Sequence, residues 1–165
     1  MKLSSTMMTA AVLAAGVTPG HGTAALYVQN QARLSHQHFQ TPLSRGQARQ
    51  SAMDALVSTY ESSSVADWDG HGAAPVSHAV YLKAYNLLEV LPDGLPMPSP
   101  GAEPDGQLTL EWHKSAYQTL SVSVTADGDL HYAALLGASR TYGTEPFLGQ
   151  LPQPLLDLIQ RVTLG

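Results

Sequence analysis

Apolar residues recur at helical spacing in the middle of the chain and predict a helix that ends before residue 92. The stripe consists of Val80, Ala84, Leu87, Leu88 and Leu91. These positions share one face of a helix, so that face is expected to pack against a core. Pro75 presets a helical φ near the expected first turn, and Pro92-Asp-Gly-Leu-Pro96 stops the helix.

Two more helices are predicted, one before and one after this segment. The first covers residues 46–61, and Ser44-Arg-Gly-Gln47 has the pattern of a capping box at its start. Its apolar residues are Ala52, Met53, Leu56 and Tyr60. The last helix opens at Pro152 or Pro154. Its apolar face consists of Leu155, Leu158, Ile159 and Val162.

Three segments alternate apolar and polar residues, which predicts half-buried antiparallel strands. Their inward residues are Leu108, Leu110 and Trp112, then Leu120, Val122 and Val124, then Leu130, Tyr132 and Ala134. Asp127-Gly128 is expected to supply the positive-φ residues of a tight hairpin, and Asp105-Gly106 turns the chain into the first strand. The proline-rich segment 96–104 reads as a stiff extended connector. The predicted fold is α+β, a three-stranded antiparallel β-meander with helices packed on one face.

Order is expected to begin near Ser44, because residues 19–41 show no recurring spacing. We therefore predict a flexible basic N-terminal arm, residues 1–43, and a single α+β domain, residues 44–165. Residues 1–50 carry four basic and no acidic side chains, whereas residues 51–165 carry four basic side chains and all thirteen acids, a net charge of −9. This segregation indicates an interaction tail or a targeting segment, and a chance scatter of charges is the alternative.

The location of the protein depends on how its first residues are interpreted. Residues 9–17 form a short alanine-rich run behind one positive charge, a weak match to an export signal. No segment approaches the ~20 apolar residues of a membrane span. We expect a cytoplasmic protein without a membrane partner, and export with cleavage near Ala25 is the alternative.

The residue types present restrict the possible chemistry. Cysteine is absent, which excludes disulfides, a thiolate nucleophile and cysteine-ligated metals. Among the seven histidines, His113 and His131 fall on outer strands of the predicted meander, near 10 Å apart at ~4.8 Å per strand. That distance is too long for one ion, and His36-Gln-His38 lies in the arm without supporting residues. No metal and no cofactor are expected.

Three motifs together resemble a known family. They are Trp68-Asp-Gly-His-Gly-Ala-x-Pro75, Pro104-Asp-Gly-x-Leu-x-Leu-Glu-Trp112, and Leu120-x-Val-x-Val followed by Asp127-Gly-x-Leu-x-Tyr132. This pattern is similar to that of a family of small bacterial proteins without an established function, over about residues 65–136. The resemblance implies a bacterial or mobile-element origin and an α+β fold, and it assigns no site.

The loop before the second predicted helix is a candidate binding site. Trp68 is expected to cap the core and to be mostly buried, while Asp69 accepts backbone amides and Gly70 and Gly72 adopt positive φ. In the functional alternative, Trp68, Asp69 and His71 hold an anion or a partner side chain ahead of the helix. An Asp–His pair without a nucleophile is weak evidence for catalysis.

The outward face of the predicted sheet is the second candidate surface, and it is small and rich in hydroxyl groups. It carries Thr109, Glu111, His113, Ser121, Ser123, Thr125, His131 and Ala133. Glu111 and His113 could exchange protons, but a flat surface does not exclude water. An ordinary solvated face, a platform for a partner and an edge open to strand addition all remain possible.

No recognisable catalytic or cofactor motif is present, so we interpret the chain as a non-enzymatic bacterial accessory protein. It would act by binding another protein, as an immunity, antitoxin or anti-defence factor does, and the acidic domain would suit a basic partner. One alternative is a small hydrolase or metal-dependent enzyme that uses Asp69, His71 and Glu111. Another is nucleic-acid contact through the basic arm, which the acidic domain disfavours.

Overall fold

Two helices, five strands and a final helix follow one another along residues 46–165, the part of the chain that the computed structural model describes. Residues 46–63 are helical, and the remaining elements are α2 (His78–Glu89), β1 (Ser99–Ala102), β2 (Leu108–Ser115), β3 (Gln118–Val124), β4 (Asp129–Leu136), β5 (Ser139–Pro146) and α3 (Gln153–Thr163). The predicted arm and the capping box at Ser44 lie outside the described residues. No helix within 46–165 is long and apolar enough to cross a membrane.

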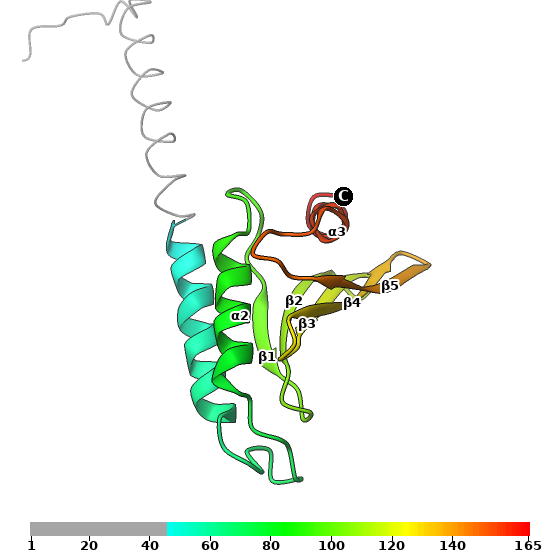
Figure 1. The fold of residues 1–165 in the computed structure, drawn as a ribbon. Helices are drawn as coiled ribbons and strands as arrows, with labels where there is room; N and C mark the ends of the chain where they lie inside the picture. The colour runs from blue at the N-terminus through cyan, green and yellow to red at the C-terminus, as the bar shows by residue number, and fades with distance from the viewer. Residues whose placement is uncertain (1–45) are drawn as a thin grey trace, which may run out of the picture. The chain divides into compact units, whose positions relative to one another are not determined.

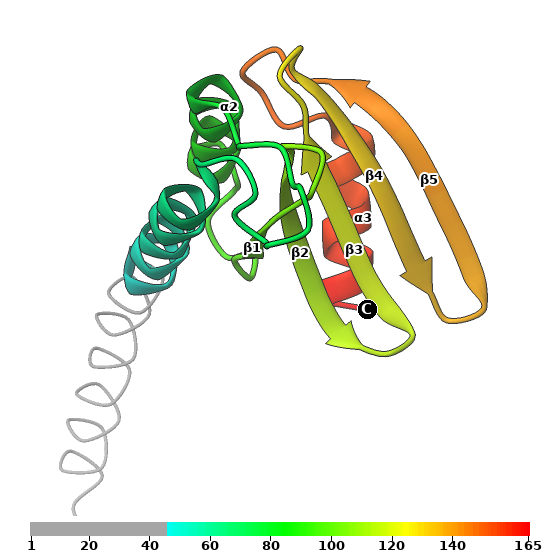
Figure 2. The ribbon, with the colours of Figure 1, turned by 90° about the horizontal axis from the view of Figure 1, so that it is seen from below.

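The five strands form one antiparallel sheet in the order β1-β2-β3-β4-β5 (Figure 1). Figure 2 shows the sheet from the face opposite α3, which we call the open face. In this view α3 lies behind β2, β3 and β4, and α2 lies beside the β1 edge. The α+β class and the meander are therefore confirmed, but the predicted number of three strands is wrong.

The two strands that the sequence does not predict lie at the two edges of the sheet. Neither has a buried face that would produce a clear apolar alternation. β1 falls within the proline-rich segment that the sequence suggests is a connector, and it pairs with β2 from Ser99↔Glu111 to Ala102↔Leu108. Pro100 is tolerated because an edge strand needs its backbone donors on one side only. β5 is exposed at nearly every position, so it lacks the apolar alternation by which a strand is recognised.

The core is a single cluster that joins one face of the sheet to all three described helices. Its most enclosed side chains are Leu56, Leu87, Leu88, Leu108, Leu110, Leu120, Leu130, Leu155, Ile159, Val122, Val124 and Val162. The predicted apolar stripes of the helices and the inward residues of β2, β3 and β4 supply almost all of it. The helices therefore cover one face, as predicted, and the opposite face of the sheet carries no helix in the described region.

Two local predictions need correction. Helix α2 begins at His78 rather than near Pro75, because the Ser77 side chain accepts the Val80 N–H (3.3 Å) and serves as the N-cap. In the turn between β3 and β4, only Gly128 has a positive φ (97°), and Asp127 does not. Gly128 N–H donates to the Thr125 carbonyl, and Thr125 N–H donates to that of Asp129, so the turn is a four-residue loop.

Arg49 connects the helix of residues 46–63 to the C-terminal end of α2. Its guanidinium donates to the carbonyl oxygens of Leu88 (2.6 Å), Glu89 (3.0 Å) and Leu91 (2.8 Å), and to Asp93 Oδ1 (2.9 Å). The last carbonyls of a helix have no partner within the helix, so this side chain satisfies them from outside.

Candidate binding surface

The loop between the first two helices is held by its own aspartates. Asp69 Oδ1 accepts the backbone N–H groups of His71 (2.8 Å) and Ala73 (3.1 Å), and Asp67 Oδ1 accepts that of Gly72 (2.6 Å). Gly70 and Gly72 have φ of 71° and 91°, which confirms the expected turn. The carboxylate of Asp69 is thus already used within the loop.

Trp68 is half-buried and lies outside the hydrophobic core, so its predicted role as a core cap is wrong. Its indole Nε1 donates to the Ala74 carbonyl (3.1 Å) in the same loop. Ala74 N–H in turn donates to the Pro104 carbonyl (2.8 Å), which ties the loop to the turn between β1 and β2. The indole therefore braces the loop, and the loop rests on the sheet through its backbone.

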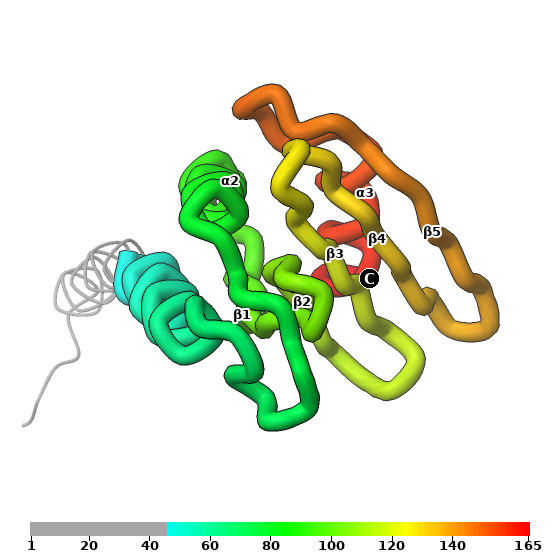
Figure 3. Tube along the Cα trace, turned by 60° about the horizontal axis from the view of Figure 1, so that its bottom comes forward, coloured from blue at the N-terminus to red at the C-terminus, as the bar shows by residue number. Residues whose placement is uncertain are grey.

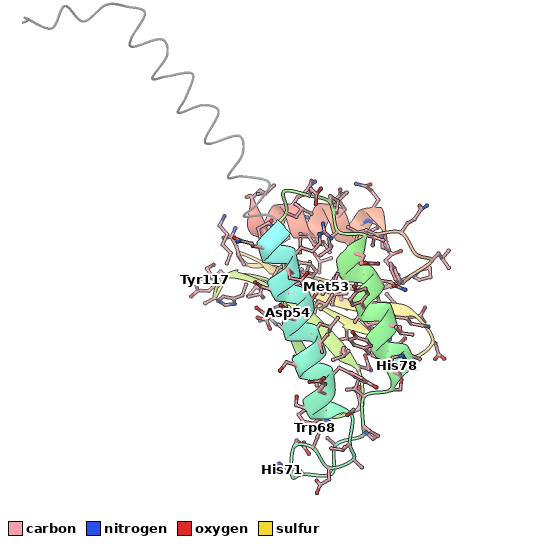
Figure 4. The ribbon with its side chains drawn as sticks, turned by 90° about the vertical axis from the view of Figure 1, so that its left-hand side faces the viewer. Met53, Asp54, Trp68, His71, His78 and Tyr117 are labelled. Atoms are coloured by element: carbon pink, nitrogen blue, oxygen red, sulfur yellow. The ribbon has the colours of Figure 1, made fainter. Side chains whose placement is uncertain are left out.

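His71 is exposed, and its Nδ1 lies 2.8 Å from the Asp69 carbonyl oxygen. Figure 4 shows Trp68 and His71 at the tip of this loop, far from Tyr117 in the turn between β2 and β3. Because Glu111 and His113 lie along β2 toward that turn, the structure does not bring Asp69 and His71 together with Glu111.

The hydrogen bonds to Asp69 predict a pH-dependent stability. The N–H groups of His71 and then Ala73 lower the pKa of Asp69 below the value of 3.8 that an unperturbed aspartate has. Its contribution is complete above 3.8 and is lost as the pH falls through the lower pKa of the folded state. Asp69→Asn should therefore be less stable than the parent in urea melts near neutral pH. The difference should shrink as the pH falls below 3.8, and a constant difference at all pH values would contradict this role.

The open face of the sheet carries three groups of polar side chains. Thr109, which is buried, donates from Oγ1 to Glu103 Oε1 (2.6 Å) and lies 3.1 Å from Ser123 Oγ. Glu111 Oε1 and His113 Nδ1 are 3.7 Å apart with both side chains exposed. On β4, His131 Nδ1 lies 2.8 Å from Thr144 Oγ1 of β5. The six predicted site residues thus separate into a loop group of Trp68, Asp69 and His71, the Glu111–His113 pair, and His131 on β4.

No metal centre follows from these groups. His113 pairs with Thr119 and His131 with Ser123, so the two histidines are separated by a whole strand and by four residues along it. Two strand spacings and four residues amount to about 16 Å. Within residues 46–165, no three histidine or acidic side chains are placed to hold one ion.

A shallow hollow opens on this face above β1, and the sequence does not predict it. It has a volume of about 260 Å³. Its lining consists of Ser99, Pro100, Gly101, Ala102, Glu103, Thr109, Glu111 and Ser121. The hollow exists because Gly101 and Ser121 are small, and a Cβ added to Gly101 would meet nothing within 4 Å. Glu103 and Glu111 place two carboxylates in its lining, and neither Asp69 nor His71 takes part.

Glu103 could not be recognised as a site residue because its position depends on β1. The alternation in β2 predicts that Thr109 and Glu111 share one face, but only the pairing of β1 with β2 brings Glu103 beside Thr109.

Comparisons with protein-family models, with curated proteins and with solved structures find no match.

Proposed function

We propose that the protein acts without catalysis, by binding a basic partner protein that inserts a lysine or arginine side chain between Glu103 and Glu111. The observation that carries this proposal is the hollow on the open sheet face. It combines two carboxylates with a floor of small residues, so a long cationic side chain could enter without displacing a large one.

The two carboxylates differ in how firmly they are held. Glu103 is half-buried and is fixed by the Thr109 hydroxyl, whereas Glu111 is half-exposed and its Oε1 lies 3.7 Å from His113 Nδ1. Glu103 therefore presents a preorganised acceptor, and Glu111 can turn toward an incoming cation. A charge-assisted hydrogen bond to such a carboxylate is about twice as strong as a neutral one.

The charge of the domain also supports a basic partner. Residues 46–165 hold five basic and thirteen acidic side chains, a net charge of −8. A field of this sign speeds the approach of a basic protein and repels nucleic-acid phosphates. Such behaviour suits the immunity, antitoxin or anti-defence class that the sequence suggests, because those proteins act by covering a partner.

An enzyme built on Asp69, His71 and Glu111 receives less support. The hydrogen bonds of Asp69 hold its own loop, and the hollows lined by Glu111 contain neither Asp69 nor His71. The Glu111–His113 pair remains open to water, which weakens any proton transfer that it could assist.

Removal of the two carboxylates should weaken partner binding. We would capture proteins of the native host on the full chain and on the Glu103→Gln/Glu111→Gln variant. A basic protein should be retained by the parent and lost from the variant. In a titration with that protein the Kd should rise by about tenfold or more, as expected for the loss of charged hydrogen bonds. The parent's affinity should fall as salt is added.

The matched control removes the same number of charges elsewhere. Glu61→Gln/Glu89→Gln changes two exposed carboxylates on the first two helices and leaves the hollow intact. This variant should bind nearly as the parent does. If both variants weaken binding equally, net charge explains the effect. If the parent and both variants retain the partner equally, the proposed site is contradicted.

A further inference from the structure

β5 forms an outer edge of the sheet along its full length. It pairs with β4 at all eight positions, from Leu136↔Ser139 to Asp129↔Pro146, without a register shift. Figure 2 and Figure 3 show it on the side away from α2. Its backbone groups make no hydrogen bond outside that ladder to any backbone group in residues 46–165. Among residues 46–165, nothing pairs with one row of its backbone donors and acceptors.

The turn before β5 determines which backbone groups form this open row. Gly137 and Ala138 connect Leu136 to Ser139, and Gly137 has φ 65°, as in a two-residue hairpin of type II′. The pair that flanks such a turn is hydrogen-bonded, and hydrogen-bonded pairs then alternate along the ladder. The backbone N–H and carbonyl groups therefore point toward β4 at residues 139, 141, 143 and 145. They point outward at Arg140, Tyr142 and Thr144.

The opposite edge is protected against pairing, but β5 is not. β1 has four residues, and Pro100 in it removes a backbone donor. Short length and proline are common devices that keep an edge from adding a strand. β5 has eight residues, no bulge and no proline before its last position, and Tyr142 on it is 84% exposed.

We infer that β5 pairs antiparallel with β5 of a second copy of this chain, with the two-fold axis at Gly143. A two-fold axis perpendicular to the sheet keeps the open faces of both copies on the same side. Residues that pair across the axis must then have side chains on the same face, so even-numbered residues pair with even-numbered ones and odd with odd. Tyr142 then faces Thr144 of the second copy, and Gly143 faces Gly143. The outward groups complete about six backbone hydrogen bonds.

Tyr132 explains why the axis falls at Gly143. It faces Gly143 across the β4–β5 ladder, and a Cβ on this glycine would lie 2.5 Å from the Tyr132 hydroxyl and 2.7 Å from its ring. The ring therefore occupies the space that a side chain on Gly143 would fill. With two glycines opposed, the two Tyr132 rings cover the gap that would otherwise weaken a strand pair at that position.

The charges along β5 favour this orientation. Arg140 lies near one end of the strand, and Asp129 of β4 pairs with Pro146 at the other end. Antiparallel pairing brings the basic end of one copy to the acidic end of the other. Arg140 faces Pro146 of the second copy, whose partner in β4 is Asp129 on the same open face. Other contacts between two copies would bring together surfaces of a domain with net charge −8.

The inference is independent of the proposed basic partner, because β5 does not line the hollow. Its consequence is a ten-stranded sheet in which the two open faces form one surface.

Sedimentation of the full chain over a wide range of concentrations tests the pairing. The parent should reach twice the single-chain mass of 17.5 kDa. Tyr142→Pro removes an outward N–H that β4 does not use, so it should fold and remain a single chain. Tyr142→Thr changes the same side chain but keeps the N–H, and it should still form dimers. A monomeric parent, or a dimeric Tyr142→Pro, would overturn the inference.

The register is tested separately, because the chain contains no cysteine. An equimolar mixture of Tyr142→Cys and Thr144→Cys should form disulfide-linked dimers on mild oxidation, since these positions face each other at a distance that a disulfide spans. Either variant alone should link much less. If Tyr142→Cys links to itself as well as the mixture does, the axis does not lie at Gly143.

Discussion

Replacement of Leu87 by alanine is expected to lower the free energy of unfolding by about 2–5 kcal/mol. Leu87 is 1% exposed and lies on the core face of α2. Its truncation leaves a cavity between the helix and the sheet that the surrounding side chains fill only in part. Leu110→Ala should cost a similar amount, because Leu110 is fully buried on the facing side of β2.

The same helix supplies a matched control. Leu82 is 45% exposed, so Leu82→Ala removes the same atoms from a site that water already reaches. Alanine also has the higher helix propensity, so stability should change by less than about 0.5 kcal/mol. Urea melts of the three variants give the comparison. A small loss at both Leu87 and Leu110 would show that the helices and the sheet do not share this core.

Arg49→Met is expected to lower the free energy of unfolding by about 1–3 kcal/mol, the range for lost hydrogen bonds to a charged group. Methionine keeps an apolar stem but removes the donors that bind the carbonyls of Leu88, Glu89 and Leu91. These carbonyls lie where a helix carries partial negative charge, so a cation there also stabilises the dipole. Arg49→Lys should recover only part of the loss, since one ammonium cannot reach all three acceptors in the arginine geometry.

The ion pair within this cluster should matter little. Asp93 is 84% exposed at its side chain, and exposed pairs contribute at most about 1 kcal/mol. Asp93→Asn should therefore melt close to the parent, whereas Arg49→Met should not. If the two variants lose equal stability, the ion pair rather than the helix carbonyls explains the role of Arg49.

The sequence predicts elements well where one face is buried. The stripe that includes Leu87 and the alternation through Leu110, Val122 and Leu130 place these side chains in one core, as the structure has them. The Asx-type turn at Asp69 is likewise a local property, because a short carboxylate bonds amides two and four residues ahead. In each case the cause lies within a few residues of the effect.

Edge strands are not predicted in this way. β1 contains Pro100 and Gly101, and β5 is polar on both faces, so neither segment shows a strand period. Each becomes a strand because a neighbour with a buried face offers it a ladder of hydrogen bonds. The helix cap at Arg49 and the pairing of Glu103 with Thr109 depend in the same way on segments brought together by the fold.

The candidate sites likewise combine features that the sequence predicts with features that only the fold determines. From the sequence alone, Glu111 and His113 are assigned to one face of a strand, Trp68, Asp69 and His71 to one loop, and the acids to the folded domain. Only the tertiary structure decides that the loop group stays apart from Glu111, that Glu103 joins Glu111 around a hollow, and that β5 is left open. Periodicity is a property of a single segment and can be read from it, whereas a hollow or an open edge depends on which segments lie next to each other.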